Sequence, residues 1–169
     1  MHKPRRSYTS GIMRKRLIQQ TSQTTLYPQQ DWLDLQKLAQ VEFTSDDPSA
    51  PIEAALLPHA QGGWCAAQAG AQTIRLLFDE PQKIRHIHLA FEELENPRSQ
   101  EFALRWSAGG SNPYYEIVRQ QYNFSPPVTT NEVEDYAVDL EGVRIIELNI
   151  LPDLNGGEAK ASLKEWYLA

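Results

Sequence analysis

The stretch QTIRLLFDEPQKIRHIHLAF, residues 72–91, decides the fold class. Apolar residues take every second position in each half of it: Ile74, Leu76 and Phe78, then Ile87, Leu89 and Phe91. A period of two is typical of a β-strand with one buried and one solvated face. The sequence Asp79-Glu80-Pro81 between the halves indicates a turn. The stretch therefore predicts two strands joined by a turn.

The same alternation recurs on both sides of this stretch, separated by turn residues every eight to twelve positions. The expected strands are 40–44, 74–78, 86–91, 102–107, 115–124, 134–140, 143–150 and 162–168. Short strands at this spacing predict an all-β antiparallel sandwich or barrel. The predicted core is Trp64, Ile74, Leu76, Phe78, Ile87, Leu89, Phe102, Leu104, Trp106 and Leu148. Residues 48–63, rich in proline and glycine, are expected to be irregular.

Length and charge divide the chain into a short arm and one domain. The 169 residues carry a net charge of −6, and 41% are hydrophobic, which suits a single core. Residues 1–30 are polar and are expected to form a flexible arm, with six basic and no acidic residues in 1–16. A short helix capped by Asp31 is expected to open the domain, 31–169. The acidic body argues against nucleic acid as the main ligand.

Cys65 is the only cysteine, so an intrachain disulfide and a cysteine-based zinc site are both excluded. The apolar runs are far shorter than the roughly 20 residues that cross a bilayer. No apolar stretch of a signal peptide follows the basic residues near the start. These observations predict a cytoplasmic protein without a membrane span.

The sequence offers little for catalysis. His86 and His88, with Glu92 after them, match the opening of a cupin metal motif, but Glu80 stands where that motif needs glycine and no third histidine follows. A solvent-facing histidine pair is therefore expected. The acidic runs 92–95 and 132–135 are interpreted as solvated loops. Neither a nucleophile elbow nor a phosphate-binding loop is present, so we expect a protein that is not an enzyme.

A group of aromatic and planar polar residues favours binding instead. Tyr114, Arg119, Tyr122 and Asn123 lie on or beside one expected strand. Flat rings cover the C–H faces of sugars, while Arg and Asn side chains bond neighbouring hydroxyls. Alternation places Arg119 and Asn123 on one face and Tyr122 on the other, so an ordinary amphipathic strand remains the alternative.

Several short sequence motifs resemble those of discoidin domains, the coagulation factor 5/8 type C family. They are GWCAA at 63–67, QTIRLLFD at 72–79, PQKIRHIHL at 81–89, FALRWSAGG at 102–110, YEIV at 115–118, VRIIEL at 143–148 and SLKEWYL at 162–168. The resemblance covers about residues 39–169. It implies a galactose-binding-like jelly roll of about eight antiparallel strands that binds ligands through loops at one end.

The resemblance also implies a function and a metal site. Members of the family are usually non-catalytic and bind sugars, phospholipid headgroups or proteins. We therefore expect a carbohydrate-binding module, with a cytoplasmic protein–protein interaction domain as the alternative. Many members hold calcium between the loop after the first strand and a glutamate near the C-terminus. Asp46, Asp47 and Glu165 lie at comparable places, and their oxygen ligands suit a structural calcium ion.

Overall fold

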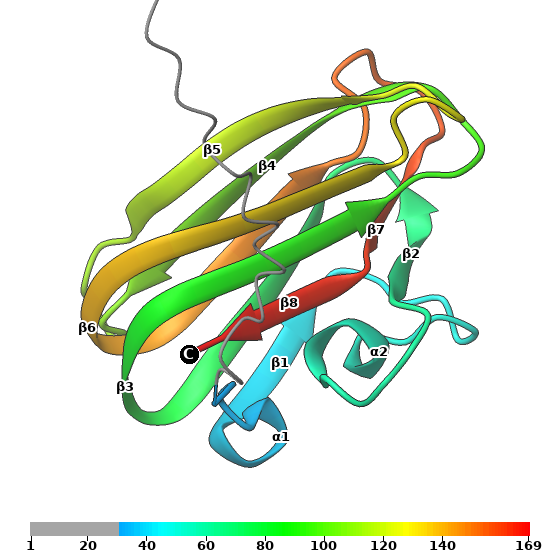
Figure 1. The fold of residues 1–169 in the computed structure, drawn as a ribbon. Helices are drawn as coiled ribbons and strands as arrows, with labels where there is room; N and C mark the ends of the chain where they lie inside the picture. The colour runs from blue at the N-terminus through cyan, green and yellow to red at the C-terminus, as the bar shows by residue number, and fades with distance from the viewer. Residues whose placement is uncertain (1–30) are drawn as a thin grey trace, which may run out of the picture.

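The computed structural model describes residues 31–169 as a sandwich of antiparallel strands, which confirms the predicted fold class (Figure 1). The predicted arm, residues 1–30, lies outside the described residues. The elements are α1 (Leu35–Leu38), β1 (Ala39–Phe43), α2 (Glu53–Leu56), β2 (Trp64–Ala69), β3 (Gln72–Glu92), β4 (Arg98–Ser107), β5 (Tyr115–Phe124), β6 (Asn131–Leu151), β7 (Lys160–Leu163) and β8 (Glu165–Leu168).

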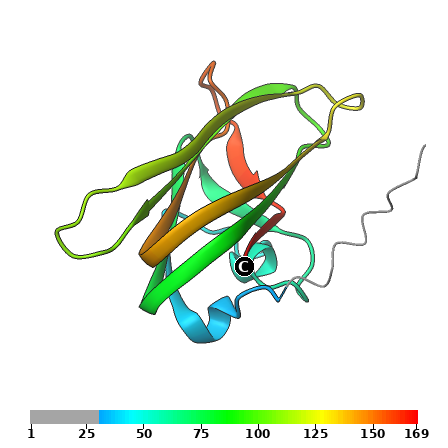
Figure 2. The same cartoon turned by 60° about the vertical axis from the view of Figure 1, so that its left-hand side comes forward.

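Two bent strands, β3 and β6, run through both layers of the sandwich (Figures 1 and 2). The first half of β3 and the second half of β6 pair with each other and lie in one layer with β1, β4 and β5. The second half of β3 pairs with the first half of β6 and with β8 in the other layer. The loops after β3, β5 and β6 therefore lie at one end of the sandwich, away from the bends.

Two of the predicted turns are bends within continuous strands. The pairing between β3 and β6 shifts register between Leu77 and His86, so the chain curves there without reversing. Pro81 falls inside this shift, where its missing N–H removes no ladder hydrogen bond. On β6 the bend lies at Gly142, whose φ of +71° is a conformation that glycine adopts without steric strain. Strong twist, rather than a loop, thus connects the two layers.

The structure differs in detail from three further expectations. The predicted irregular stretch 48–63 contains the four-residue helix α2, and the strand β2 follows it and pairs with β7. The predicted strand 162–168 is divided into β7 and β8 at Lys164. Helix α1 is only four residues long and begins after Asp34 rather than Asp31. The reason is that the backbone of Leu33 donates to the carbonyl of Leu168 at 2.7 Å, which holds residues before α1 extended.

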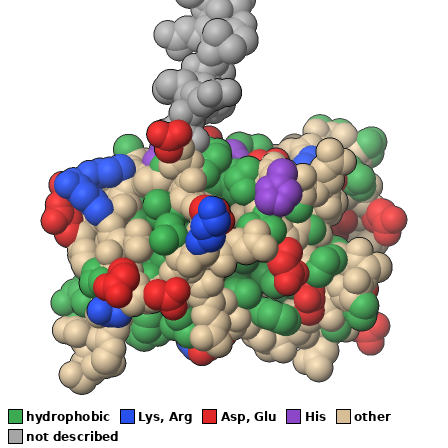
Figure 3. Space-filling view, turned by 90° about the horizontal axis from the view of Figure 1, so that it is seen from below, with side chains coloured by type: hydrophobic (Ala, Val, Ile, Leu, Met, Phe, Trp, Pro, Cys, Tyr) green, Lys and Arg blue, Asp and Glu red, His purple; other side chains and the backbone are tan. Residues whose placement is uncertain are grey.

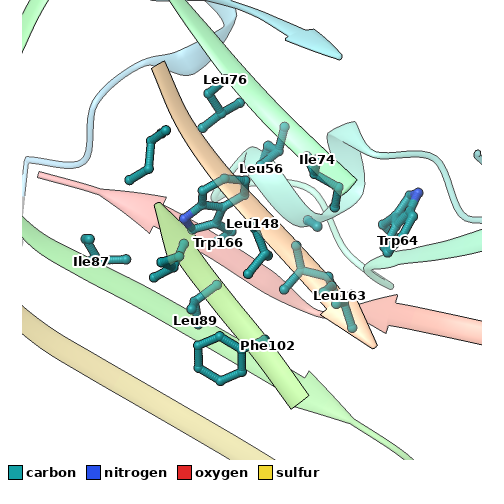
Figure 4. Close-up of a cluster of buried hydrophobic side chains, with 14 of the residues drawn as sticks. Leu56, Trp64, Ile74, Leu76, Ile87, Leu89, Phe102, Leu148, Leu163 and Trp166 are labelled. Carbon is teal, nitrogen blue, oxygen red and sulfur yellow. The ribbon is translucent and has the colours of Figure 1, made fainter. Parts of the chain in front are cut away.

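The core lies between the two layers and continues under α2 (Figure 4). Nine of the ten predicted core residues are buried: Trp64, Ile74, Leu76, Phe78, Ile87, Leu89, Phe102, Leu104 and Leu148. Trp106 is the exception: it is only partly buried, because it lies near the end of β4, where its ring centre is 5.5 Å from that of exposed Tyr115. Trp166 on β8 is fully buried and was absent from the prediction.

Figure 3 shows the underside of the molecule, where hydrophobic side chains reach the surface among scattered charged ones. A hollow of about 190 Å³ lies between α1, α2 and β1 and is lined by Leu35, Val41, Leu56 and Leu57 among others. Within residues 31–169, none of the helices has the length and apolar character that crossing a membrane requires.

Candidate functional site

A cleft of about 790 Å³ lies at the loop end of the sandwich. Its walls are the loop from β3 to β4, the loop from β6 to β7, and the start of β2. The lining residues include Gly62, Trp64, Cys65, residues 92–98, Asp153, residues 156–160, Ser162, Leu163 and Lys164. The cleft lies where the sequence predicts a binding region, among loops at one end of the sandwich.

Close backbone approach shapes one wall of the cleft. A Cβ on Gly63 would lie 2.7 Å from the carbonyl oxygen of Leu163, and its φ of +72° also disfavours a side chain. The β6–β7 loop is tied to β4 because the N–H of Leu154 donates to the carbonyl of Ser99 at 2.8 Å. The walls are therefore held by backbone contacts, and the lining side chains are free to make other contacts.

Arg98 is the central charged group of the cleft floor. Its side chain is only 2% exposed, and its Nε donates to Glu93 at 2.9 Å. Its Nη1 donates to Gln100 at 2.9 Å and to the carbonyl of Pro152 at 2.8 Å. The guanidinium also lies 4.8 Å from the centre of the Phe124 ring. Arg98 thus fixes the positions of both loops relative to β4.

Among the charged side chains that line the cleft, carboxylates outnumber basic groups. Acidic side chains are Glu92, Glu93, Glu95, Asp153 and Glu158, and basic ones are Arg98, Lys160 and Lys164. Glu92 pairs with Lys164 at 3.0 Å. Within the described part of the chain, Glu95, Asn96 and Glu158 form no side-chain hydrogen bond or ion pair with protein groups. Because Trp64, the aromatic residue of the lining, is 1% exposed, the cleft has no open aromatic platform; its apolar lining includes Leu94 and Pro97.

A buried polar network continues from Arg98 into the interior. Gln100, 0% exposed, donates to Glu132, which is 2% exposed. Burial raises the pKa of Glu132 to about 7, and the nearby carboxylate of Glu134 adds to this. Gln120 donates to Glu134 and accepts from the hydroxyl of Tyr136 at 2.7 Å. The interpretation of residues 132–135 as a solvated loop is therefore wrong, because they lie on β6 with Glu132 facing inward.

The structure divides the predicted β5 site between two faces. Arg119 and Asn123 lie on the outer face, where Arg119 donates to Glu101 at 2.7 Å and to Glu116 at 2.9 Å. Asn123 accepts a hydrogen bond from the hydroxyl of Ser99. Tyr122 faces the opposite side, and its hydroxyl donates to the carbonyl of Asn131.

Tyr114 has a different partner from the other predicted β5 residues. Its ring lies 4.8 Å from the guanidinium carbon of Arg105. The four residues, Tyr114, Arg119, Tyr122 and Asn123, therefore do not converge on one ligand. Each one instead supports a local contact of the sheet.

The histidine pair forms a compact cluster on the outer face of the other layer. Nε2 of His86 and Nδ1 of His88 lie 2.9 Å and 2.8 Å from the same oxygen of Asp135. Trp32 covers both rings, with centroid distances of 5.5 Å and 6.0 Å. The pair is therefore not solvent-facing as predicted. Glu92 of the partial metal motif pairs elsewhere, with Lys164.

The predicted calcium ligands are not brought together. Asp47 accepts from the backbone and hydroxyl of Ser49, at 2.9 Å and 2.8 Å, in a tight turn. Glu165 lies 2.8 Å from Nε2 of His88 on β3. Oδ1 of Asp46 is buried without a hydrogen-bond partner in the described part of the chain, and burial raises the pKa of this carboxyl. Across residues 31–169, no three His, Cys, Asp or Glu side chains are arranged to hold a metal ion.

The polar residues that the sequence interpretation missed are Glu93, Arg98, Gln100 and Glu132. A signal for them exists in the alternation itself. Arg98 and Gln100 fall in phase with the inward-facing Phe102, so the pattern places them in the interior. A polar residue at an inward position predicts a buried partner, but the pattern does not say which one.

Comparison with solved structures identifies similar folds. This chain resembles the family 32 carbohydrate-binding module of Clostridium perfringens NanJ, which was solved in complex with galactose. The two are 12% identical with a TM-score of 0.57, over 77% of this chain and 92% of the module. The likeness is one of fold, an antiparallel β-sandwich like that of this carbohydrate-binding module. No protein-family model matches the sequence, and no curated protein matches it.

Two further family 32 carbohydrate-binding modules agree with this comparison. The family 32 module of AlyQ, in complex with 4,5-unsaturated mannuronic acid, is 14% identical over 78% of this chain and 95% of its own, with a TM-score of 0.57. A third such module, from a family 31 glycoside hydrolase of Clostridium perfringens, is 15% identical over 81% and 93%, with a TM-score of 0.59. At these identities the likeness establishes the fold.

Proposed function

We propose that this chain is a non-catalytic carbohydrate-binding module whose ligand occupies the cleft at the loop end. The observation that carries the proposal is the position of the cleft: a polar hollow of about 790 Å³ between loops of a galactose-binding-like sandwich. Sites of this size accept small ligands and orient them with a few polar groups. The neighbours in complex with galactose and mannuronic acid support a saccharide as the ligand class. The discoidin-like sequence motifs support the proposal that this chain belongs to the factor 5/8 type C branch of this fold.

The cleft suits a neutral saccharide. Glu95, Asn96 and Glu158 present acceptors and donors that no protein group uses in residues 31–169. Hydroxyl groups donate to carboxylates and accept from amides, so both kinds of contact are available. The excess of carboxylates disfavours uronic acids by like-charge repulsion. An open cleft without an aromatic platform gives modest affinity, in the micromolar to millimolar range, or roughly 4–8 kcal/mol.

A glycan array followed by titration calorimetry tests this function. We expect wild-type protein to bind a neutral saccharide and Asn96→Ala and Lys160→Ala each to weaken binding several-fold. Arg119→Ala is the matched control, because its guanidinium is engaged by Glu101 and Glu116 away from the cleft. Absence of binding to every glycan contradicts the function. Loss of binding in Arg119→Ala, with the cleft variants unchanged, contradicts the site.

A protein partner is the second candidate, favoured by exposed apolar side chains at the cleft rim. Leu94 is 63% exposed and Leu154 is 41% exposed, each in a loop beside the cleft. Apolar side chains grouped with a polar surface are typical of interaction sites. Recovery of a stoichiometric partner by wild type, and its loss in Leu94→Ser, would favour this function over saccharide binding.

A further inference from the structure

A continuous hydrogen-bonded path connects the cleft to a buried carboxyl group. It begins at Glu93, which lines the cleft and accepts from Nε of Arg98 at 2.9 Å. Arg98 donates to Gln100 at 2.9 Å, and Gln100 donates to Glu132 at 3.4 Å. We call Arg98, Gln100 and Glu132 the Arg98–Glu132 network. The cleft carboxylate and the interior carboxyl thus share one arginine and one amide.

Glu132 is the unusual member of this network. Its Oε2 accepts from Gln100, but its Oε1 is buried and has no hydrogen-bond partner among residues 31–169. The carboxylate of Glu134, two residues away on the same strand, raises the pKa of Glu132 further by like-charge repulsion. Two ionised carboxylates offer only acceptors to each other, so the pair lacks a donor. A proton on Glu132 supplies that donor and removes one of the two like charges.

The other groups around Glu132 do not replace this proton. From β4 the inward-facing charged residue is Arg98, and it reaches Glu132 through Gln100. From β3 the residue paired with Glu132 is Phe91, which is apolar. From its own strand Glu134 repels it, and Tyr136 donates to Gln120 instead. From β5 the facing side chain Gln120 is neutral and donates to Glu134. With burial, these surroundings raise the pKa of Glu132 to about 7, so both of its forms are populated near neutral pH.

We propose that Glu132 is a positioning residue whose proton controls how firmly Arg98 holds the cleft carboxylate of Glu93. The inference rests on the proposed function for its effect on ligand binding. When Glu132 is ionised, it attracts Gln100 and Arg98 inward and competes with Glu93 for the guanidinium charge. When Glu132 is protonated, Arg98 neutralises Glu93 more fully. At higher pH, where Glu132 is ionised and draws Arg98 away, Glu93 is therefore the better acceptor for a ligand hydroxyl.

The first test follows the network itself by NMR, without a ligand. In the wild type, the side-chain N–H signals of Arg98 and Gln100 should shift between about pH 5.5 and pH 8.5 with one midpoint near 7. Glu132→Gln keeps the shape and carries a permanent donor toward Glu134, so these shifts should disappear. Glu141→Gln, on an exposed side chain of the same strand, should leave them intact. Signals that stay flat in the wild type, or that still shift in Glu132→Gln, overturn the proposal.

The second test measures affinity for a neutral saccharide by calorimetry at about pH 6 and about pH 8. We expect wild-type affinity to rise several-fold at the higher pH and that of Glu132→Gln to stay constant. Gln100→Met, which breaks the link while keeping side-chain length, should also bind independently of pH. Equal pH dependence in wild type and Glu132→Gln overturns the proposal. If no saccharide binds at either pH, the proposed function fails, and the NMR titration still decides whether Glu132 controls Arg98.

Discussion

Nη2 of Arg75 lies 2.7 Å from Oε2 of Glu147, a carboxylate whose side chain is only 1% exposed on the outer face of the sheet. Glu147 also accepts from Arg105 on its other side and from Asn149 at 2.8 Å. Burial alone would raise the pKa of Glu147, but the hydrogen bonds from Arg105, Asn149 and Arg75 outweigh it and lower the pKa. The carboxylate is therefore ionised and fully paired.

These residues belong to a row of alternating charges that crosses five strands. Backbone pairing places the members side by side: Glu42, Arg75, Glu147, Arg105 and Glu116. Opposite charges at directly paired positions stabilise a sheet by about 0.2–1 kcal/mol per pair. The row also specifies register, because a slip of one residue would move every member to the inner face.

The first prediction concerns this row. Glu147→Gln should lower the free energy of unfolding by about 3 kcal/mol, because two arginines would lose their buried counter-charge. Glu42→Gln is the control, since Glu42 is half-exposed and its pairing with Arg75 should contribute less than about 1 kcal/mol. Urea unfolding of both variants at neutral pH measures the difference. Equal stability of the two variants would show that the row is merely a surface arrangement.

The fold class could be predicted from the sequence because alternation depends on each residue and its immediate neighbours. The alternation of Ile74, Leu76 and Phe78 indicates a strand with one buried face, whichever strand lies beside it. Turn residues carry less information, since Asp79-Glu80-Pro81 lies in a bend rather than a loop. A turn and a bulged bend use the same residue types, and only the partner strand β6 decides between them.

The candidate site could be predicted only as a region, the loops at one end. Its central contact joins Arg98 to Glu93, Gln100 and Pro152, and the last of these is 54 positions away. No local pattern encodes such a pairing. The predicted β5 residues failed to converge for the same reason. Arg119 on β5 donates a hydrogen bond to Glu101 on the neighbouring strand β4 and does not line the cleft.

The second prediction tests the close approach beside the cleft. Gly63→Ala should destabilise the protein by about 2–3 kcal/mol, because its Cβ would lie 2.7 Å from the Leu163 carbonyl and its φ is positive. Gly62→Ala shares a positive φ, +95°, but meets nothing within 4 Å, so it should lose only about 1 kcal/mol. Thermal unfolding of both variants separates the steric effect from the backbone effect. A smaller loss in Gly63→Ala than in Gly62→Ala would contradict the described approach of β2 to β7.

The third prediction concerns the histidine cluster at acid pH. Burial would raise the pKa of Asp135, but hydrogen bonds from His88 and His86 lower it below its usual value of 3.8. A carboxyl with a lowered pKa stabilises the folded state above its unfolded pKa, and this stabilisation is lost as pH falls through the folded pKa. Asp135→Asn should therefore be less stable than wild type at neutral pH, with the difference shrinking below about pH 4. Chemical unfolding across this range measures it, and a difference independent of pH would exclude the ionic contribution.

The last prediction concerns ligand charge in the cleft. Glu95 and Glu158 line it without protein partners in residues 31–169, so their charges act on whatever enters. At a separation of 4 Å in a watery cleft, each would repel a uronate carboxylate by about 1 kcal/mol. The double variant Glu95→Gln with Glu158→Gln should therefore bind oligogalacturonate several-fold better than wild type does, while its affinity for a neutral oligosaccharide of the same length should not rise. High salt should reduce the difference, because exposed charges are screened over about 8–10 Å at moderate ionic strength. Calorimetry with both ligands, at low and high salt, measures these affinities. An equal gain for the neutral ligand would mean that the glutamines act through shape or hydrogen bonding, and the electrostatic account of selectivity would then be wrong.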